Sequence, residues 1–374
     1  MTTPLAFARN LRSALPVMLT AAFLASGTQH ADGQLFGYWN NNNGAAWTTN
    51  NRWAFNAIPN GAGDIGIVLR NISANQAISL NGDRTVGYFN YGDTNRTHNW
   101  DIATGTSGNL IFDQGLGGGY AYLTRFAGLA DSISANITLN DNLVVITREN
   151  NAARSLTLSG TLGGTGTLIA GAYSDGQLFI TGDNSSSPVP FHIYQRGTSN
   201  LNFVPQVVFN AATGNAVGAG LTLGNATLTG NGNAILDLQE GRANLDQIKD
   251  SIHVIGDGFN SNNRRAFLRL NGGSETLGGV TDLGGGLVIE NWSVGSSQSS
   301  PATLTIKGDT GTDSFLSGVV RNTAATTASN SVDDNVNNNG GADEFRQGDS
   351  KAGSTYTPSS FALSLVKEGP STLT

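Results

Sequence analysis

The segments Ser155-Leu-Thr-Leu-Ser-Gly160 and Gly166-Thr-Leu-Ile-Ala170 carry the pattern that decides the fold of this chain. Leucine or isoleucine alternates with threonine, so the apolar side chains lie on one face of a strand and the hydroxyls on the other. Such runs, broken by glycine and asparagine, predict short β-strands joined by turns. The pattern returns at Gly220-Leu-Thr-Leu-Gly224, Asn225-Ala-Thr-Leu-Thr-Gly230, Ala302-Thr-Leu-Thr-Ile-Lys-Gly308 and Ser371-Thr-Leu-Thr374.

Strands of four or five residues cannot bury much apolar surface alone. Stacking them in parallel coils about 4.8 Å apart would join their inner faces into one core. Glycine and asparagine suit the corners because both tolerate positive φ. The repeat spacing is irregular, and β-sandwiches also use short alternating strands. We favour an all-β, right-handed parallel β-helix with an N-terminal cap, because a solenoid fills a long chain simply by adding coils.

Composition narrows the class of protein further. Charged residues make up 13% of the 374 residues, about half the usual share, so charged helix faces are scarce. The low charge also argues against ordinary disorder. A net charge of −7 without a basic stripe makes nucleic acid an unexpected partner. The chain has no cysteine, which excludes disulfides and thiolate metal sites.

The N-terminus has the pattern of an export signal. Arg9 and Arg12 precede an apolar stretch, residues 14–25, that is too short to remain in a bilayer as a spanning helix. A buried globular helix is the alternative interpretation of this stretch. We predict that residues 1–33 are a signal peptide and that the protein is secreted or displayed at the cell surface. Cleavage after Gly33 would leave Gln34 first, and cleavage after Gly27 or Ala31 also fits.

The remainder of the chain divides by composition into four parts. No segment after residue 33 is apolar for long enough to cross a membrane. The last part stops inside a repeat, so we expect the chain to be a piece of a longer protein. The predicted parts are a Trp-rich N-terminal cap (34–70), the β-solenoid (71–321), a polar Asn/Asp/Ser-rich loop (322–359) and the start of a further β-strand repeat (360–374).

The polar loop contains a partial calcium-binding pattern. Asp333, Asn335, Asn337 and Glu344 fall at positions 1, 3, 5 and 12 of a calcium loop. Asn338, however, stands where the glycine of that motif belongs, and no flanking helices are predicted. We interpret the segment as a solvated loop and predict no metal or cofactor.

The N-terminal aromatic residues allow two interpretations. Trp39, Trp47 and Trp53, with Tyr38 and Phe55, could form a platform on which sugars stack. A solenoid must also cover the apolar interior and strand edge of its first coil. We favour this capping role.

Chemistry-bearing residues do not form a recognisable catalytic set. His98, His192 and His253 lack ligand-like spacing, and His30 lies in the signal. The acids that a polysaccharide-cleaving β-helix could use are Asp237, Glu240, Asp246 and Asp257, with Arg264 and Arg265 nearby. Their spacing does not place them on one face, so we predict that the protein is not an enzyme and has no catalytic residues.

Three segments resemble the autotransporter-associated β-strand repeat family of bacterial passenger-type proteins. The resemblance covers the beginning and the last third of the chain, and it implies a right-handed β-helix displayed at a surface. It implies no catalytic residue, because the family motif marks strands and turns. Pro370-Ser371 departs from the motif, which has a small residue and glycine there. The segments are Leu363–Thr374, Glu275–Val280 with Gly284–Asn291 and Ala302–Ile306, and Trp47–Trp53 with Pro59–Asp64 and Ile67–Leu69.

The function expected from these features is that of a passenger, stalk or adhesive surface of a larger protein. Threonine, asparagine and serine ladders would meet glycans, extracellular matrix or neighbouring cell surfaces through many weak contacts. The alternatives are a carbohydrate-active β-helix and a spacer that carries a distal effector.

Overall fold

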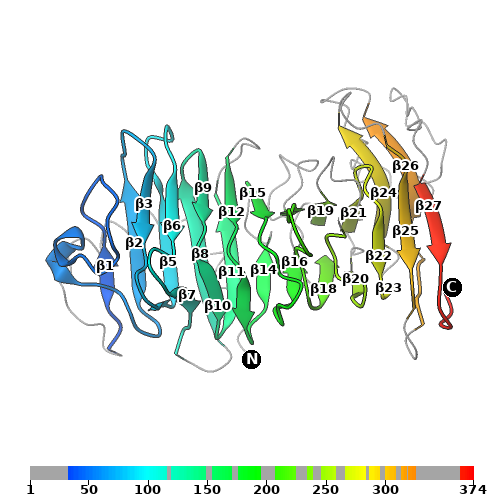
Figure 1. Ribbon diagram of the computed structural model, residues 1–374, viewed down its shortest axis with the longest axis horizontal. Coiled ribbons are helices and arrows are strands. Elements are labelled where there is room, and N and C mark those ends of the chain that lie inside the picture. The colour runs from blue at the N-terminus through cyan, green and yellow to red at the C-terminus, as the bar shows by residue number, and fades with distance from the viewer. Residues whose placement is uncertain are drawn as a thin grey trace.

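The computed structural model describes residues 33–115, 119–148, 154–170, 176–194, 207–224, 234–238, 246–257, 266–283, 286–294, 300–308, 313–317, 319–325 and 363–374. These residues form an elongated stack of β-coils in which every pairing between named strands is parallel (Figure 1). The prediction of an all-β parallel β-helix is confirmed.

Two ten-stranded sheets run along the stack. The first sheet contains β1 (Phe36–Tyr38), β2 (Ile65–Arg70), β5 (Tyr88–Asp93), β8 (Tyr120–Ala127), β11 (Asn142–Thr147), β14 (Leu168–Ala170), β16 (Phe191–Ile193), β18 (Leu221–Gly224), β20 (His253–Asp257) and β23 (Gly279–Asp282). The second sheet contains β3 (Gln76–Ser79), β6 (Trp100–Ala103), β9 (Ala130–Ile133), β12 (Ser155–Leu158), β15 (Gln177–Ile180), β17 (Val207–Phe209), β19 (Ala234–Leu238), β21 (Ala266–Arg269), β24 (Leu287–Val294) and β26 (Val319–Ala325).

Two shorter sheets form a third side of the stack, which we call the third face. The chain passes from the first sheet to the second, then to the third face, and back to the first sheet one coil further along. The sheets of the third face are β4 (Arg84–Val86), β7 (Asn109–Phe112), β10 (Asn136–Leu139) and β13 (Leu162–Gly164), and β22 (Glu275–Leu277), β25 (Ala302–Ile306) and β27 (Leu363–Lys367).

The core is a column of apolar, mostly aliphatic side chains stacked in register. On the first sheet, one row consists of Ala121, Leu143, Leu168, Phe191, Leu221, Val254 and Val280, each in register with the next. On the second sheet, the facing row consists of Leu156, Leu178, Val207, Leu236, Leu268 and Ile289. All of these side chains are buried. Burying one such side chain contributes about 1.5–3 kcal/mol, so the column is the main source of stability.

Asparagine side chains join the coils at their corners. Asn75 Oδ1 accepts a hydrogen bond from Asn99 N at 3.0 Å, and Asn99 Oδ1 accepts one from Ala130 N at 2.8 Å. Asn142 Oδ1 likewise accepts from Thr167 N at 3.0 Å. Backbone donors that leave the strand ladder are therefore satisfied by the coil before them, which explains why asparagine suits these corners.

Glycine is required where two coils approach closely. Gly164 has a φ of +97°, and a Cβ at this position would lie 2.2 Å from the carbonyl oxygen of Leu139 in the preceding coil. Only glycine adopts this conformation without strain and without that clash.

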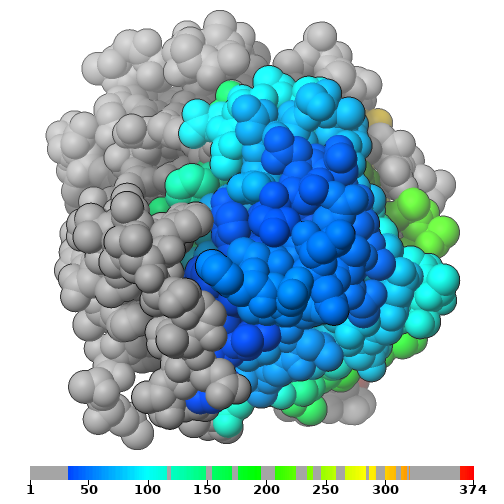
Figure 2. Space-filling model, turned by 90° about the vertical axis from the view of Figure 1, so that its left-hand side faces the viewer, coloured from blue at the N-terminus to red at the C-terminus, as the bar shows by residue number. Residues whose placement is uncertain are grey.

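The three tryptophans close the N-terminal end of the column. The segment that carries them includes β1 and two short 3₁₀ helices, η1 (Asn50–Arg52) and η2 (Ala54–Asn56). Trp47 N donates to Ser79 O at 2.8 Å, which lays this segment on the first coil. Figure 2 shows the N-terminal residues, in blue, across this end of the molecule. The structure therefore contains the N-terminal cap that the sequence predicted.

Two predicted segment boundaries differ from the strands. The first sheet begins with β1 and β2, before the predicted solenoid start at residue 71, because the apolar run from Ile65 already pairs with Tyr88 of β5. Residues 322–325 belong to β26 and pair with β24, so the strand continues into the predicted polar loop. The rest of that loop up to residue 359 and residues 1–32 of the predicted signal lie outside the described residues.

We expect the inward and outward positions of one strand to differ sharply in their effect on stability. Leu156→Ala should lower the free energy of unfolding by about 3 kcal/mol, because it leaves a cavity in the column. Thr157→Ala, on the outward face of the same strand, should change it by less than about 0.5 kcal/mol. Urea unfolding followed by circular dichroism measures both values. Equal losses in the two variants would contradict the assigned faces.

Candidate functional site

The described candidate acids lie on three different faces of the solenoid. Asp237 is in β19 of the second sheet, Asp257 ends β20 of the first sheet, and Asp246 is on the third face. Glu240, Arg264 and Arg265 lie outside the described residues. A glycosidase needs two carboxyl groups that flank one bond. The three described acids do not form such a pair with one another.

Two histidines lie on the first sheet and use their rings in local contacts. His192 Nε2 is 2.9 Å from Gly224 O, and His253 Nε2 is 2.7 Å from Thr281 Oγ1. Burial lowers the pKa of both imidazoles. Within the described ranges, no group of three His, Asp or Glu residues could hold a metal ion. His30 and the calcium-like segment 333–344 lie outside those ranges.

The N-terminal tryptophans are too buried to act as a sugar platform. Trp39, Trp47 and Trp53 are at most 1% exposed and belong to the core. The Trp53 ring lies 5.1 Å from that of Trp39 and 5.0 Å from that of Trp47. Trp47 Nε1 donates to Pro59 O at 2.9 Å. Phe55 is 76% exposed, and Tyr38 is half-buried with the Arg70 guanidinium above its ring.

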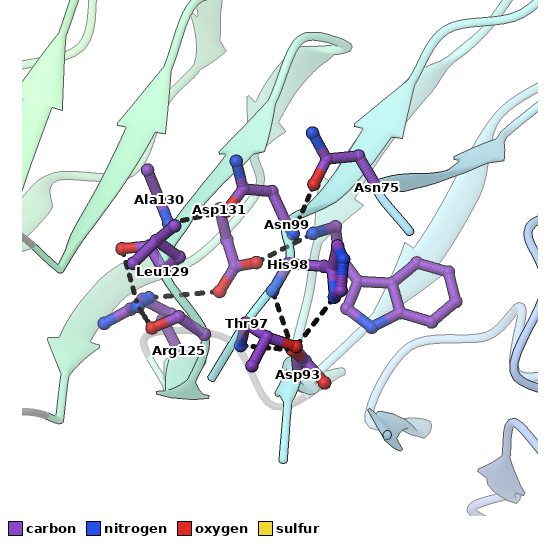
Figure 3. A network of polar contacts seen from close by, with 11 residues as sticks. Asn75, Asp93, Thr97, His98, Asn99, Arg125, Leu129, Ala130 and Asp131 are labelled. Carbon is purple, nitrogen blue, oxygen red and sulfur yellow. Dashed lines mark hydrogen bonds and ion pairs between the residues drawn. The ribbon is translucent and has the colours of Figure 1, made fainter. Parts of the chain in front are cut away.

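A buried ion pair interrupts the apolar column near its N-terminal end (Figure 3). Arg125 Nε lies 3.1 Å from Asp131 Oδ2, and both side chains are fully buried. Asp131 Oδ1 accepts a hydrogen bond from Trp100 N at 2.8 Å. The Arg125 guanidinium also donates to the carbonyl oxygens of Gly128 and Leu129. The pair thus ties the end of β8 to the start of β9 and to the coil before it.

Asp93 organises the neighbouring corner of the same network (Figure 3). Its Oδ2 accepts hydrogen bonds from Thr97 N at 2.8 Å and His98 N at 2.9 Å. Its Oδ1 accepts one from Ile72 N at 3.1 Å. His98 contributes its backbone N–H, and its Nδ1 lies 2.7 Å from Thr97 Oγ1, so both its backbone and its ring are used within this corner.

Burial makes Asp131 an unusual carboxylate. Removal from solvent raises its pKa from 3.8 to about 6, against the opposing effects of the Trp100 N–H and the Arg125 guanidinium. Because this pKa is higher in the folded than in the unfolded chain, the contribution of Asp131 to stability is complete below about pH 4. That contribution is lost as the pH rises through about 6.

A second polar group lies on the third face, beyond β19. Lys307 forms an ion pair with Asp250, whose carboxyl group is hydrogen-bonded to that of Asp246. The buried Glu275 accepts hydrogen bonds from Gln247 N at 3.0 Å and Ile248 N at 3.1 Å. This group joins segments from three coils.

Sequence reasoning did not identify most residues of the buried ion pair or of the polar group on the third face. The alternation of inward and outward positions along the strands does point to them. Arg125 has the same phase as the inward-facing Ala121 and Leu123, and Asp131 has the same phase as Ile133. Glu275 similarly shares the phase of Leu277. A charged residue at an inward position of an alternating strand must be paired or neutralised. Only Asp246 was among the predicted candidates.

Comparison with known proteins adds no assignment to these groups. No family model, curated protein or solved structure matches the chain. No helix among the described residues is long and apolar enough to cross a membrane.

Loss of one partner of the buried ion pair should cost more than loss of both. Arg125→Met should lower the free energy of unfolding by about 3–5 kcal/mol, because Asp131 loses its partner in the core and must be buried either unpaired or protonated. The double variant Arg125→Met/Asp131→Leu should be more stable than Arg125→Met, since leucine matches Leu156, the partner of Asp131 in the next coil. Urea unfolding of both single variants and the double variant gives the coupling, expected at about 0.5–3 kcal/mol. Additive losses would show that the pair does not act as a unit.

Proposed function

We propose that this chain is an exported β-solenoid that serves as a passenger, stalk or adhesive surface of a bacterial surface protein. The observation that supports this role is a continuous apolar core beneath outer faces that carry in-register polar residues in several of the described coils. Some of these outer groups bond to one another, as Asp101 does with Ser132 and Ser134, and their partly exposed side chains face outward.

The outer rows provide repeated groups of the kind that bind glycans. On the second sheet, Asp101, Ser132 and Thr157 lie in register on the outer side, and all three are half-buried. On the third face, Thr276 and Thr305 are in register and half-buried. Hydroxyl and carboxyl groups donate to and accept from sugar hydroxyls. Polar groups in register on two or three successive coils favour binding by several weak contacts.

We propose the relationship to the autotransporter-associated β-strand repeat proteins on the same grounds. The segment most similar to the family motif, Leu363–Thr374, contains β27, which pairs in parallel with β25. A parallel β-coil is what this resemblance implies. The proposal includes no catalysis, in keeping with the separation of Asp237, Asp246 and Asp257 on three faces.

Multivalent display should reveal binding that a single copy does not show. The purified chain, as a monomer and coupled to beads at high density, would be applied to a glycan array, to extracellular matrix and to cells. Avidity should raise the binding of the coupled form by about 100-fold or more. The absence of binding to every surface at high density would remove the adhesive role and leave that of a stalk.

Removal of ladder hydroxyls should weaken this binding. Thr276→Ala/Thr305→Ala deletes two hydroxyls that lie in register on the third face. Thr94→Ala/Thr106→Ala is the matched control, because these threonines are exposed and lie outside the strands. We expect reduced bead binding for the ladder variant alone. Equal binding by both variants would exclude this ladder from the contact surface.

A further inference from the structure

The third face changes its means of holding coils together between β13 and β22. The four-stranded sheet ends at β13, and the three-stranded sheet begins at β22. Among the described residues between them, the backbone contributes a single parallel bridge, between Val217 and Ile248, with a few hydrogen bonds, and side chains supply many of the other links. Asn184 Oδ1 accepts from Leu162 N at 2.7 Å, and Gln247 Oε1 accepts from Ala211 N at 2.7 Å. Glu275 holds the backbone of Gln247 and Ile248 in the same way.

At the C-terminal side of this region, cohesion depends on carboxyl groups. Asp246 directly precedes Gln247, and its side chain is hydrogen-bonded to that of Asp250. Asp250 also pairs with Lys307, which follows β25, so the ion pair links positions 57 residues apart in the sequence. We call Asp246, Asp250 and Lys307 the acid clasp.

The charges around the clasp are mostly negative. Glu275 of β22 interacts electrostatically with Asp246, and Glu368, which follows β27, interacts with Lys307. Lys249 lies between the two aspartates in sequence, and its side chain is exposed. A hydrogen bond between two carboxyl groups requires a shared proton, because two carboxylates in contact repel each other. Without that proton, Lys307 must compensate for the charges of Asp246, Asp250 and Glu275.

The ionisation of these groups agrees with a shared proton. Burial, reinforced by Asp250, raises the pKa of Asp246 from 3.8 to about 6. Burial, reinforced by Asp246, raises the pKa of Glu275 well above its usual range. The hydrogen bond from Lys307 lowers the pKa of Asp250. Asp246 is therefore the member of the clasp that holds the proton.

We propose that the acid clasp is a proton-dependent lock, in which the shared proton keeps the segment 246–252 closed against β22 and the end of β25, and loss of the proton loosens it. The lock tightens in acid and weakens at neutral pH. The change is local, because the first and second sheets continue through this region and hold the coils in place.

The sign of the pH effect follows from the direction of each shift. A raised pKa in the closed form means that the contribution of Asp246 is complete below about pH 4 and is lost as the pH rises through about 6. Glu275 acts in the same direction. Asp250, whose pKa is lowered, loses its contribution only as the pH falls below 3.8. Between pH 5 and 7, release of the proton from Asp246 should raise the opening equilibrium about tenfold.

Hydrogen–deuterium exchange of the full chain at pH 5 and pH 7, corrected for intrinsic exchange rates, measures this opening. Peptides that cover 246–257 and β22 should show about tenfold more opening at pH 7. Asp246→Asn keeps a hydrogen-bond donor and cannot ionise, so these peptides should stay protected at both pH values. Asp183→Asn is the control, because Asp183 is an exposed carboxylate on another coil, and it should respond as the unmodified chain does.

Three results would overturn the proposal. The first is equal protection of these peptides in the unmodified chain at pH 5 and pH 7. The second is an unchanged pH response in Asp246→Asn. The third concerns Lys307→Met, which serves as the test if Asp246→Asn does not fold. This variant should open the segment more than the unmodified chain does at pH 7, because the ionised pair loses its counter-charge. Equal opening in the two proteins would exclude the lock. Peptides from β8 and β9 report separately on Asp131 and should not respond to either variant.

Discussion

In-register parallel stacking is the constraint on which the whole structure depends. Each inward position is fixed by the residue directly before it and directly after it along the column, as in the row from Ala121 to Val280. An apolar side chain in one coil therefore favours an apolar neighbour in the next, as Leu168 and Phe191 show. Any charged residue in such a row must bring its own partner, as Arg125 does with Asp131. Coil length is free to vary, because extra residues loop out at corners without disturbing the rows.

The fold could be predicted from the sequence because alternation is a local signal. Leu156 and Thr157 differ in environment for a reason visible in four residues of sequence. The polar groups could not be predicted in the same way, because their partners are set by register. Glu275 contacts Gln247, and Asp250 contacts Lys307, because the coils between them bring these positions side by side. Those coils differ in length, so the pairings do not follow from spacing in the sequence. The acids Asp237 and Asp257 show the reverse case, since they are close in sequence and lie on different sheets.

The polar groups of the described residues have mainly structural explanations. Asn75 and Asn99 complete the backbone hydrogen bonding of the next coil, and Asp93 orders a corner. These contacts account for much of the asparagine and aspartate usage without invoking a ligand. The outer surface carries further hydroxyl groups in register, as at Thr276 and Thr305. The interruption of the third face is the exception, because side chains there supplement a shortened backbone ladder, and some of them titrate.

The buried tryptophan cluster covers the N-terminal side of the first coil. Stability in a stack of coils is the sum of each coil's own contribution and its contact with its neighbours, so a terminal coil is held from one side only. Trp39, Trp47 and Trp53 supply the missing side for the first coil. Loss of this cover should therefore lower the stability of the first coil most, and that of coils further along the stack progressively less.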